Sequence, residues 1–294
     1  IPFPIAQVDA HEAQYRVIYK YREEFEVKAM CKFFKLSRAA YYEWLKRSKE
    51  PDPDLKRMQL VEEAWLKSRK TYGYRRITIA LQQQGHVINH KAVLRLMQKI
   101  NIRSVARKRK PYKKTPHIDI YHRYENILRR DFTATKPNEK WVTDVSYVMT
   151  QRGWAYLSTI KDLFDGFIVA HLLGKENSIS LVTDTVKLAT QKEEIKDEVL
   201  IHSDQGRPYT SEEYFLLTTR YQMKQSMSRR GNCWDNAPME NFFGHFKEEA
   251  LRQYPVPTFR QAQEIVDGYI AFYNYERIQL KTKQTPYQKR CLFK

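Results

Sequence analysis

The stretch "KWVTDVSYVMTQRGWAYLSTIKDLFDGFIVAHLLG", residues 140–174, decides the fold of this chain because it reads as three consecutive strands. Its segments 140–149, 154–162 and 166–174 are rich in Val, Ile, Thr, Tyr and Trp, which pack well on a pleated sheet. The short segment "QRG" at 151–153 has the composition of a turn. Three strands joined by such short connections predict a β-meander.

After the meander, helical and strand-like patterns alternate. We expect helices near 178–191, 211–220 and 236–251, and strands near 198–202 and 223–227. This order predicts an α/β core of a mixed five-stranded sheet with flanking helices, spanning 135–252. It is the element order of ribonuclease H-like folds.

Three carboxylates fall at related places in this order. Asp144 lies within the first strand, where a buried charge is costly unless it is paired or bound to a metal ion. Asp204, in "LIHSDQG", ends the fourth strand, which in such folds runs beside the first. Glu240 lies near the start of the last helix, because Pro238 is tolerated only in a first helical turn.

Three converging carboxylates would hold Mg²⁺, a hard cation that prefers oxygen ligands. Two such ions could activate a water or a 3′-hydroxyl and stabilise the leaving oxygen in phosphoryl transfer. Ordinary turn chemistry is the alternative at Asp204, since Asp and Gly both favour turns. We interpret four other acidic residues near element ends as turn, cap or surface groups: Asp162, Asp165, Asp184 and Asp235.

The charge balance indicates a polyanionic partner. Lys and Arg number 52 against 34 Asp and Glu, which gives a formal net charge of +18. Nucleic acid is the first candidate. An anionic membrane is the second, but the sequence has neither an apolar run of ~18 residues nor a signal peptide, so we expect a cytoplasmic chain. Cys31, Cys233 and Cys291 lie too far apart to predict a disulfide framework or a zinc site.

Two helical units precede the core. Residues 24–48, within a first domain at 1–50, have the outline of a helix-turn-helix in which Ser37 caps the second helix. Residues 51–104 predict a second such domain, with Asp54 and Asn89 as helix caps. A small helical bundle used for protein contacts is the alternative for each unit.

Basic residues in the second unit and the following linker are expected to contact DNA. The second unit offers Arg75, Arg76, Lys91 and Arg95. The linker, 105–134, overlaps a run at 103–114 with seven basic residues and no acid, in which Arg107, Lys108, Arg109 and Lys110 are consecutive. Such a run releases counterions when it lies on DNA; a solvated linker is the alternative. A helical and then basic tail occupies 253–294.

Together, "WVTDVSY", "HSDQG" and "NAPMENFFGHFKEE" resemble the catalytic segments of retroviral integrase-like transposases, which carry two aspartates and a glutamate. More narrowly, the chain resembles the downstream-frame protein of bacterial insertion sequences that move by copy-out, paste-in transposition. The resemblance covers nearly the whole chain. "YGYRRI" and "LRLMQK" are similar to the helix-turn-helix of that family, and "YNYERIQLKTKQTPYQ" is similar to its tail.

This resemblance implies a DNA transposase with Asp144, Asp204 and Glu240 as ligands of Mg²⁺, for which Mn²⁺ can substitute. Lys247 would contact DNA near the active site. The implied reaction is strand cleavage at the ends of the element, followed by attack of the freed 3′-hydroxyl on another DNA strand. The implied partners are double-stranded terminal inverted repeats, target DNA and further copies of the chain, at the bacterial nucleoid.

The sequence departs from the family in three respects. Pro208 stands where Gln is common, and the zinc-binding His-His-Cys-Cys module of retroviral integrases is absent, so we expect DNA recognition without zinc. The chain begins at Ile1, as expected of a fusion or a trimmed product. The competing hypothesis is a DNA-binding regulator that keeps the scaffold without its chemistry. A nuclease for RNA–DNA hybrids ranks lowest, because it would not need two helix-turn-helix units.

Overall fold

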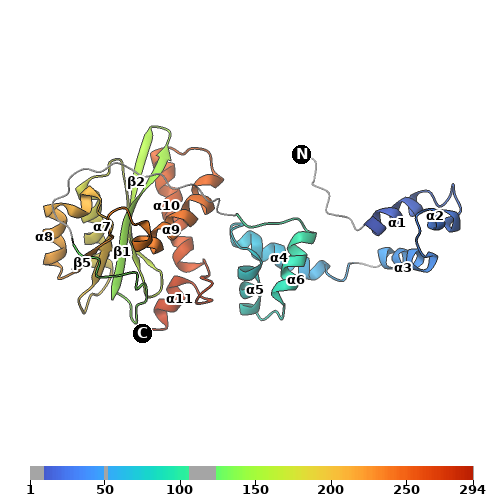
Figure 1. Ribbon diagram of the computed structural model, residues 1–294, viewed down its shortest axis with the longest axis horizontal. Helices are drawn as coiled ribbons and strands as arrows, with labels where there is room; N and C mark the ends of the chain where they lie inside the picture. The colour runs from blue at the N-terminus through green and yellow to red at the C-terminus, as the bar shows by residue number, and fades with distance from the viewer. Residues whose placement is uncertain (1–9, 50–51, 106–123, 294) are drawn as a thin grey trace. The chain divides into compact units, whose positions relative to one another are not determined.

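The computed structural model describes residues 10–49, 52–105 and 124–293. The chain divides into two compact units, 1–104 and 105–294. Within the described ranges, the first unit contains only helices and the second contains the whole sheet (Figure 1). No described helix is long and apolar enough to span a membrane.

The first three helices surround a small apolar core. This core consists of Ile18, Cys31 and Tyr41, one from each helix. The helices are α1 (Ala10–Lys20), α2 (Val27–Phe33) and α3 (Arg38–Lys49). The last two are the helices expected within 24–48, and α3 begins directly after Ser37 as predicted.

The next three helices are α4 (Leu55–Lys67), α5 (Tyr74–Gln83) and α6 (His90–Lys99), and they pack against one another. Asn89 caps α6, as predicted, by accepting a hydrogen bond from the backbone N–H of Lys91. The prediction that the Asp54 side chain caps α4 is wrong. Its carboxylate instead accepts two hydrogen bonds from Arg95, at 2.7 and 3.1 Å, because a bidentate guanidinium binds a carboxylate more strongly than one backbone N–H does.

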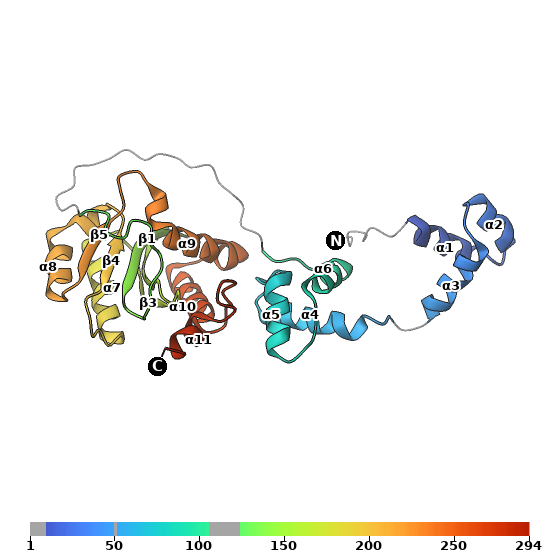
Figure 2. The same ribbon diagram turned by 60° about the horizontal axis from the view of Figure 1, so that its bottom comes forward.

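The second unit is built on a five-stranded sheet with the strand order β3-β2-β1-β4-β5 (Figure 2). The strands are β1 (Lys140–Thr150), β2 (Gly153–Asp162), β3 (Ile168–Gly174), β4 (Leu200–Ser203) and β5 (Lys224–Met227). β1, β2 and β3 pair antiparallel, whereas β4 lies parallel to β1 and to β5. The predicted meander, the mixed sheet and the place of the fourth strand beside the first are confirmed.

Helices cover both faces of this sheet. Figures 1 and 2 show α7 (Ile179–Lys192) and α8 (Glu212–Arg220) on one face, and α9 (Ala237–Glu249) and α10 (Phe259–Tyr275) on the other. The described chain also has a short helix α11 and three 3-10 turns, with the bounds Pro286–Cys291, Arg207–Thr210, Cys233–Asn236 and Leu251–Gln253. The core under α7 contains Trp141 and Ile160 from the sheet and Val182 and Val186 from α7.

Part of the expected linker packs against the core. The backbone N–H groups of Ile127 and Leu128 donate to Ser226 Oγ on β5, at 3.0 and 3.1 Å. Leu128 is buried. The described residues 124–128 therefore form part of the second unit.

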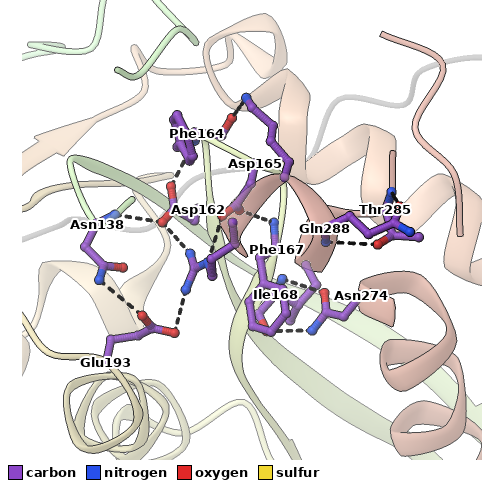
Figure 3. Close-up of polar contacts among 12 residues, drawn as sticks. Asn138, Asp162, Phe164, Asp165, Phe167, Ile168, Glu193, Asn274, Thr285 and Gln288 are labelled. Carbon is purple, nitrogen blue, oxygen red and sulfur yellow. Dashed lines mark hydrogen bonds and ion pairs between the residues drawn. The ribbon is translucent and has the colours of Figure 1, made fainter. Parts of the chain in front are cut away.

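Arg290 on α11 attaches the end of the described chain to the core. Its guanidinium donates to Asp162 at the end of β2, to Asp165 in the following turn and to Glu193 after α7, at 2.6, 2.7 and 2.5 Å. Figure 3 labels these three carboxylate residues. Asp162 and Asp165 also accept turn hydrogen bonds from Phe164 and Phe167, as their expected turn role requires. Both aspartates are buried, and their interpretation as turn residues is confirmed.

Replacing Arg290 with Leu should destabilise the second unit by about 3–5 kcal/mol, since it leaves three carboxylates without their shared cation. Urea-induced unfolding followed by circular dichroism measures this loss. The matched control is Arg260→Leu, which removes an exposed i,i+4 pair with Glu264 and should change stability little. Equal effects of the two substitutions would contradict the importance of the Arg290 cluster.

Candidate active site

The site forms where β1 and β4 separate. β4 pairs with only the first three residues of β1, Lys140 to Val142. Asp144 lies just beyond this paired stretch, and Asp204 directly follows the last residue of β4. Since neighbouring parallel strands end at the same edge of a sheet, both carboxylates lie at one crevice of the fold, the usual ligand-binding edge of such sheets.

The carboxylates at this edge of the sheet repel one another. Burial raises the pKa of Asp144 well above its ordinary value, and the negative charges of Asp204 and Glu240 raise it further. A hydrogen bond from the backbone of Val145 and the positive charge of Lys247 act in the opposite direction. Burial also raises the pKa of Asp204. The three other side chains predicted from the sequence, Asp204, Glu240 and Lys247, therefore lie within electrostatic reach of Asp144.

These carboxylates do not form a closed ligand cluster. Within the described residues, no three or more His, Cys, Asp or Glu side chains are grouped so that they could hold a metal ion. Carboxylates approach one another closely only when a cation or a proton compensates their charge.

The surrounding atoms nevertheless fit a hydrated divalent cation. Carboxylate oxygens are the ligands that Mg²⁺ prefers. Three buried side-chain oxygens lack a hydrogen-bond partner in the described part of the protein: Thr159 Oγ1, Gln205 Oε1 and Asn236 Oδ1. Each belongs to a residue that is close to one of the carboxylates, either along the chain or on the neighbouring strand. Thr159 lies opposite Asp144 in the β1–β2 register, and Gln205 follows Asp204. Since an unpaired buried oxygen is costly, ion-bound water would satisfy these atoms.

Gly206 leaves room for the Asp204 carboxylate in the turn after β4. The backbone N–H of Gly206 donates to Asp204 Oδ1 at 2.9 Å. A Cβ at residue 206 would lie 2.9 Å from the same oxygen, which is closer than real Cβ contacts. Gly206 therefore allows the carboxylate to fold back over its own turn, which confirms the predicted glycine turn behind Asp204.

Thr143 connects the three segments that carry the carboxylates. Its backbone carbonyl accepts a hydrogen bond from Asn236 Nδ2 at 3.1 Å, which ties the start of α9 to β1. Its hydroxyl lies 3.1 Å from the Tyr209 hydroxyl, which ties the turn after Asp204 to the same strand. We did not identify these three residues from the sequence. The sequence does show a polar residue close to each of the three carboxylates. Polar residues are also common at the ends of strands and helices that carry no site, so this pattern was not sufficient to identify them.

Asp235 holds the segment that leads into α9 in place. We predicted that it caps this helix, and that prediction is wrong, because Asn236 occupies the N-cap position. Asp235 is fully buried and its carboxylate accepts hydrogen bonds from Arg229 and Arg130, at 2.7–3.0 Å. Reading it as a surface group is therefore also wrong. Two guanidinium partners outweigh the cost of burial and hold the pKa of Asp235 far below its ordinary value.

The far end of α9 is held by Glu249. Its carboxylate accepts hydrogen bonds from Arg277, at 2.6 and 2.7 Å, and from the hydroxyl of Tyr269 on α10 at 2.9 Å. Burial alone would raise the pKa of Glu249, but hydrogen bonds from His245 and Arg277 outweigh it and hold this pKa at about 2. The helix that carries Glu240 and Lys247 is thus fixed at both ends.

The predicted DNA-contact residues of the second helical unit differ in their surroundings. Arg75 and Lys91 are exposed, and Arg76 is half-buried with its guanidinium 6.0 Å from the centre of the Tyr72 ring. Arg95 is exposed but forms the ion pair with Asp54 described above. The four consecutive basic residues of the linker, Arg107, Lys108, Arg109 and Lys110, lie outside the described residues.

Glu249 predicts a specific pH dependence of stability. Because its pKa in the folded chain lies below the ordinary 4.5, its ionised form favours folding at neutral pH. This contribution should persist above pH 4.5 and disappear as the pH falls toward 2. Urea unfolding of the wild type and of Glu249→Gln should therefore differ most at pH 7, and the difference should shrink by on the order of 3 kcal/mol in acid. A difference independent of pH would contradict this role.

Two known domain families match the chain. The integrase core domain matches residues 134–233 and, in a second model, residues 240–291. An HTH-like domain matches residues 52–110, which include α4, α5 and α6. The first integrase match contains Asp144 and Asp204, and the second begins at Glu240.

Solved structures of retroviral integrases are similar to this chain at low sequence identity. The HTLV-2 integrase catalytic core domain in complex with magnesium is 17% identical, with a TM-score of 0.43, and the match covers 53% of this chain and 97% of that chain. An intasome of simian T-cell lymphotropic virus is 17% identical, with a TM-score of 0.47, over 77% of this chain and 73% of that chain.

Curated relatives match over nearly the whole length. The putative transposase InsK for insertion sequence element IS150, from Escherichia coli (strain K12), is 34% identical over 276 residues, which cover 94% of this chain and 97% of the relative. The transposase InsF for insertion sequence IS3A, from the same organism, is 31% identical over 81% of this chain and 84% of the relative. The chain thus belongs to the family of bacterial insertion-sequence transposases, with an HTH-like domain ahead of an integrase core.

Proposed function

We propose that this transposase cleaves DNA strands at the ends of its insertion sequence and joins the freed 3′-hydroxyl to another strand, and that Asp144, Asp204 and Glu240 carry this chemistry. The observation that carries the proposal is the half-buried Asp144 side chain, whose carboxylate has a pKa that is raised by desolvation and by the neighbouring Asp204 and Glu240 charges. Such mutual repulsion is typical of a site built for cations and not for a stable fold alone.

Asp144, Asp204 and Glu240 would hold Mg²⁺ or Mn²⁺, without zinc. When bound, such ions would make the attacking water or 3′-hydroxyl more acidic and would stabilise the negative charge on the leaving oxygen. Asp144, within β1, and Asp204, directly after β4, would hold the ions beside the scissile phosphate, and Glu240 would reach the same place from α9. Lys247, two turns along that helix, offers a positive charge to the neighbouring phosphate. No side chain needs to act as a general base.

DNA recognition is proposed for the helical units and the linker. Residues 1–50 and 51–104 would act as separate DNA-binding domains, which the basic linker holds to the core. The proposed DNA-contact residues are Arg75, Arg76, Lys91, Arg95, Arg107, Lys108, Arg109, Lys110 and Lys247. Arg95 would engage a phosphate only by releasing Asp54, so its contribution is expected to be smaller than that of the exposed Arg75.

The proposed partners are the double-stranded terminal inverted repeats, the target DNA and further copies of the chain. Joining two ends requires two active sites near each other, which favours a dimer or a larger assembly on DNA at the bacterial nucleoid. The general test is cleavage and joining of a labelled duplex carrying the end of the element, with Mg²⁺, Mn²⁺ or EDTA. Tight binding without products under every condition would favour the non-catalytic regulator.

Asp144→Asn, Asp204→Asn and Glu240→Gln should each lower cleavage and joining by more than about a hundredfold, because each removes a charge that acts on the transition state. DNA binding, measured by gel shift, should change little. The matched control is Asp184→Asn, which neutralises an exposed carboxylate on α7 that pairs with Lys187. If one of the three variants retained full activity, that residue would be excluded from the site.

Gly206→Ala should lower the rate of cleavage by about a hundredfold, since a new Cβ would push the Asp204 carboxylate out of its turn and small displacements at reacting groups are costly. The matched control is Gly268→Ala on α10, where an added Cβ meets nothing within 4 Å. Single-turnover rates of both variants, at saturating DNA, would make the comparison. Unchanged rates in Gly206→Ala would show that the position of Asp204 is not limiting.

A further inference from the structure

A buried aspartate holds two partly exposed arginines in the segments that lead to α9. Arg229 donates to both oxygens of Asp235, at 2.9 and 3.0 Å, and Arg130 donates to Oδ1 of the same carboxylate at 2.7 Å. Arg130 also donates to Asn232 Oδ1 at 3.1 Å. The Asp235 side chain is 0% exposed, whereas those of Arg229 and Arg130 are 60% and 44% exposed. A guanidinium carries more N–H groups than these contacts use, so each arginine retains donors for a ligand. We call Arg130 and Arg229 the arginine pair.

The arginine pair carries more positive charge than its aspartate neutralises. Two guanidinium charges face one carboxylate, which leaves a surplus of one positive charge. The neighbouring Arg129 and Arg230 are exposed as well. Within the described segments 126–131 and 228–234, the acidic residue is Asp131, whose carboxylate pairs with a lysine of β1 at 2.7 Å. The surface around the arginine pair therefore favours an anionic ligand.

Asp144 and Asp204 lie on one face of the sheet together with His202 and Ser226. His202 on β4 pairs with Val142 of β1 on one side and with Ser226 of β5 on the other. Residues that pair directly share a face, and so do residues two apart along a strand. Asp144 follows Val142 by two residues, and Asp204 follows His202 by two. The face that carries Ser226 is therefore the face of the carboxylate site.

Arg229 leaves the sheet at the same edge as Asp204. β4 and β5 are parallel, and their last residues pair with each other. Asp204 is the first residue beyond β4, and Arg229 is the second beyond β5. Neighbouring strands lie about 4.8 Å apart, so these two segments leave the edge side by side. Burial lowers the pKa of His202 to about 4, and the charge of Asp235 acts in the opposite direction, so the aspartate between the two arginines also lies near this face.

The segment that carries Arg130 is bound to the same face. Ser226 Oγ accepts a hydrogen bond from the backbone N–H of Leu128 at 3.1 Å. Arg129 and Arg130 then adopt left-handed φ angles of 46° and 63°, a conformation that is unfavourable for residues with a side chain. Such strain persists where the surrounding contacts enforce it, and it is common where a protein holds a ligand. With the chain in this conformation, the Arg130 side chain reaches Asp235.

We propose that the arginine pair binds a backbone phosphate of the DNA strand, close to the phosphate held at Asp144 and Asp204. This inference rests on the proposed function. Guanidinium groups bind phosphate oxygens through paired N–H groups. Because Asp235 fixes both groups in advance, less side-chain freedom is lost when DNA binds. A phosphate contact at this place carries no sequence information, but it sets the register of the strand relative to the carboxylates and thus which phosphate is cut.

The first test measures the salt dependence of DNA binding by the full chain in EDTA, so that no strand is cut. The probe is a labelled duplex carrying the end of the element, and its fluorescence anisotropy gives the affinity over a series of NaCl concentrations. Loss of one phosphate contact lowers the slope of log K against log salt by about 0.9. Arg130→Gln and Arg229→Gln should each lower the slope by about this amount and weaken binding about tenfold, because the remaining arginine is then balanced by Asp235.

Two further variants serve as controls. Arg229→Lys keeps a positive charge beside Asp235 and should keep the wild-type slope. Arg220→Gln removes an exposed arginine at the end of α8, on the opposite face of the sheet, and should change neither the slope nor the affinity. Circular dichroism checks that each variant is folded. Arg130→Gln leaves both hydrogen bonds from Arg229 to Asp235 in place, so the test stands on this variant if Arg229→Gln does not fold.

The second test locates the phosphate. A series of duplexes carries a single uncharged methylphosphonate linkage, moved step by step through the cleavage site. We expect a position near the reacting phosphate at which the wild type loses about tenfold in affinity and at which Arg130→Gln and Arg229→Gln show no further loss. Two outcomes would overturn the proposal: an unchanged salt slope in both glutamine variants, or the same losses in these variants and the wild type at every position. Either outcome with a lowered melting temperature would leave the arginines a structural role alone.

Failure of this inference is distinguishable from failure of the proposed function. Both binding tests are made without a divalent cation, whereas the role of Asp204 is tested by metal-dependent products. Wild-type slopes and losses in the arginine variants, together with cleavage that depends on Asp204, would reject only the phosphate site. A lost phosphate contact in the arginine variants, together with normal cleavage by Asp204→Asn, would reject only the catalytic assignment.

Discussion

The short parallel pairing of β1 with β4 is the constraint on which the rest of the second unit depends. Only three residue pairs connect these strands, so β1 continues alone beyond Val142. This free stretch leaves Asp144 beside the crevice next to Asp204. A longer β4 would pair with the free edge of β1 and close this crevice. The site is therefore a consequence of one early strand ending.

Buried ion pairs hold the elements around this crevice. Asp235 with its two arginines lies before α9, Glu249 with Arg277 lies at the end of α9, and Arg290 joins β2, the β2–β3 turn and α7. In each cluster the carboxylates accept hydrogen bonds from arginine, so burial carries a smaller penalty. One guanidinium faces three carboxylates in the Arg290 cluster, so burial and the neighbouring Asp165 charge still raise the pKa of Asp162 to about 7. At Asp144, burial and the charges of Asp204 and Glu240 raise the pKa, and the charge of Lys247 lowers it.

Much of the sheet could be predicted from the sequence, because its pattern is local. Alternating β-branched and aromatic residues and the turn at 151–153 were sufficient for the meander, and the position of Pro238 placed Glu240 near a helix start. The cap assignments of Asp54 and Asp235 failed because each carboxylate found a distant arginine, and no local pattern encodes such a partner. Tyr209, Thr143 and Asn236 were missed for the same reason, since their contacts join segments more than sixty residues apart.

The placement of Arg290 imposes an order on synthesis. Its three carboxylate partners precede it by roughly a hundred residues or more, so they leave the ribosome long before their shared cation does. The helical units of residues 1–104 are complete by then, and domains generally fold as they emerge. A nascent chain can thus present finished helical units while its catalytic core is still open. Closing that core waits for Arg290, and this separates in time the part proposed to read DNA from the part proposed to cut it.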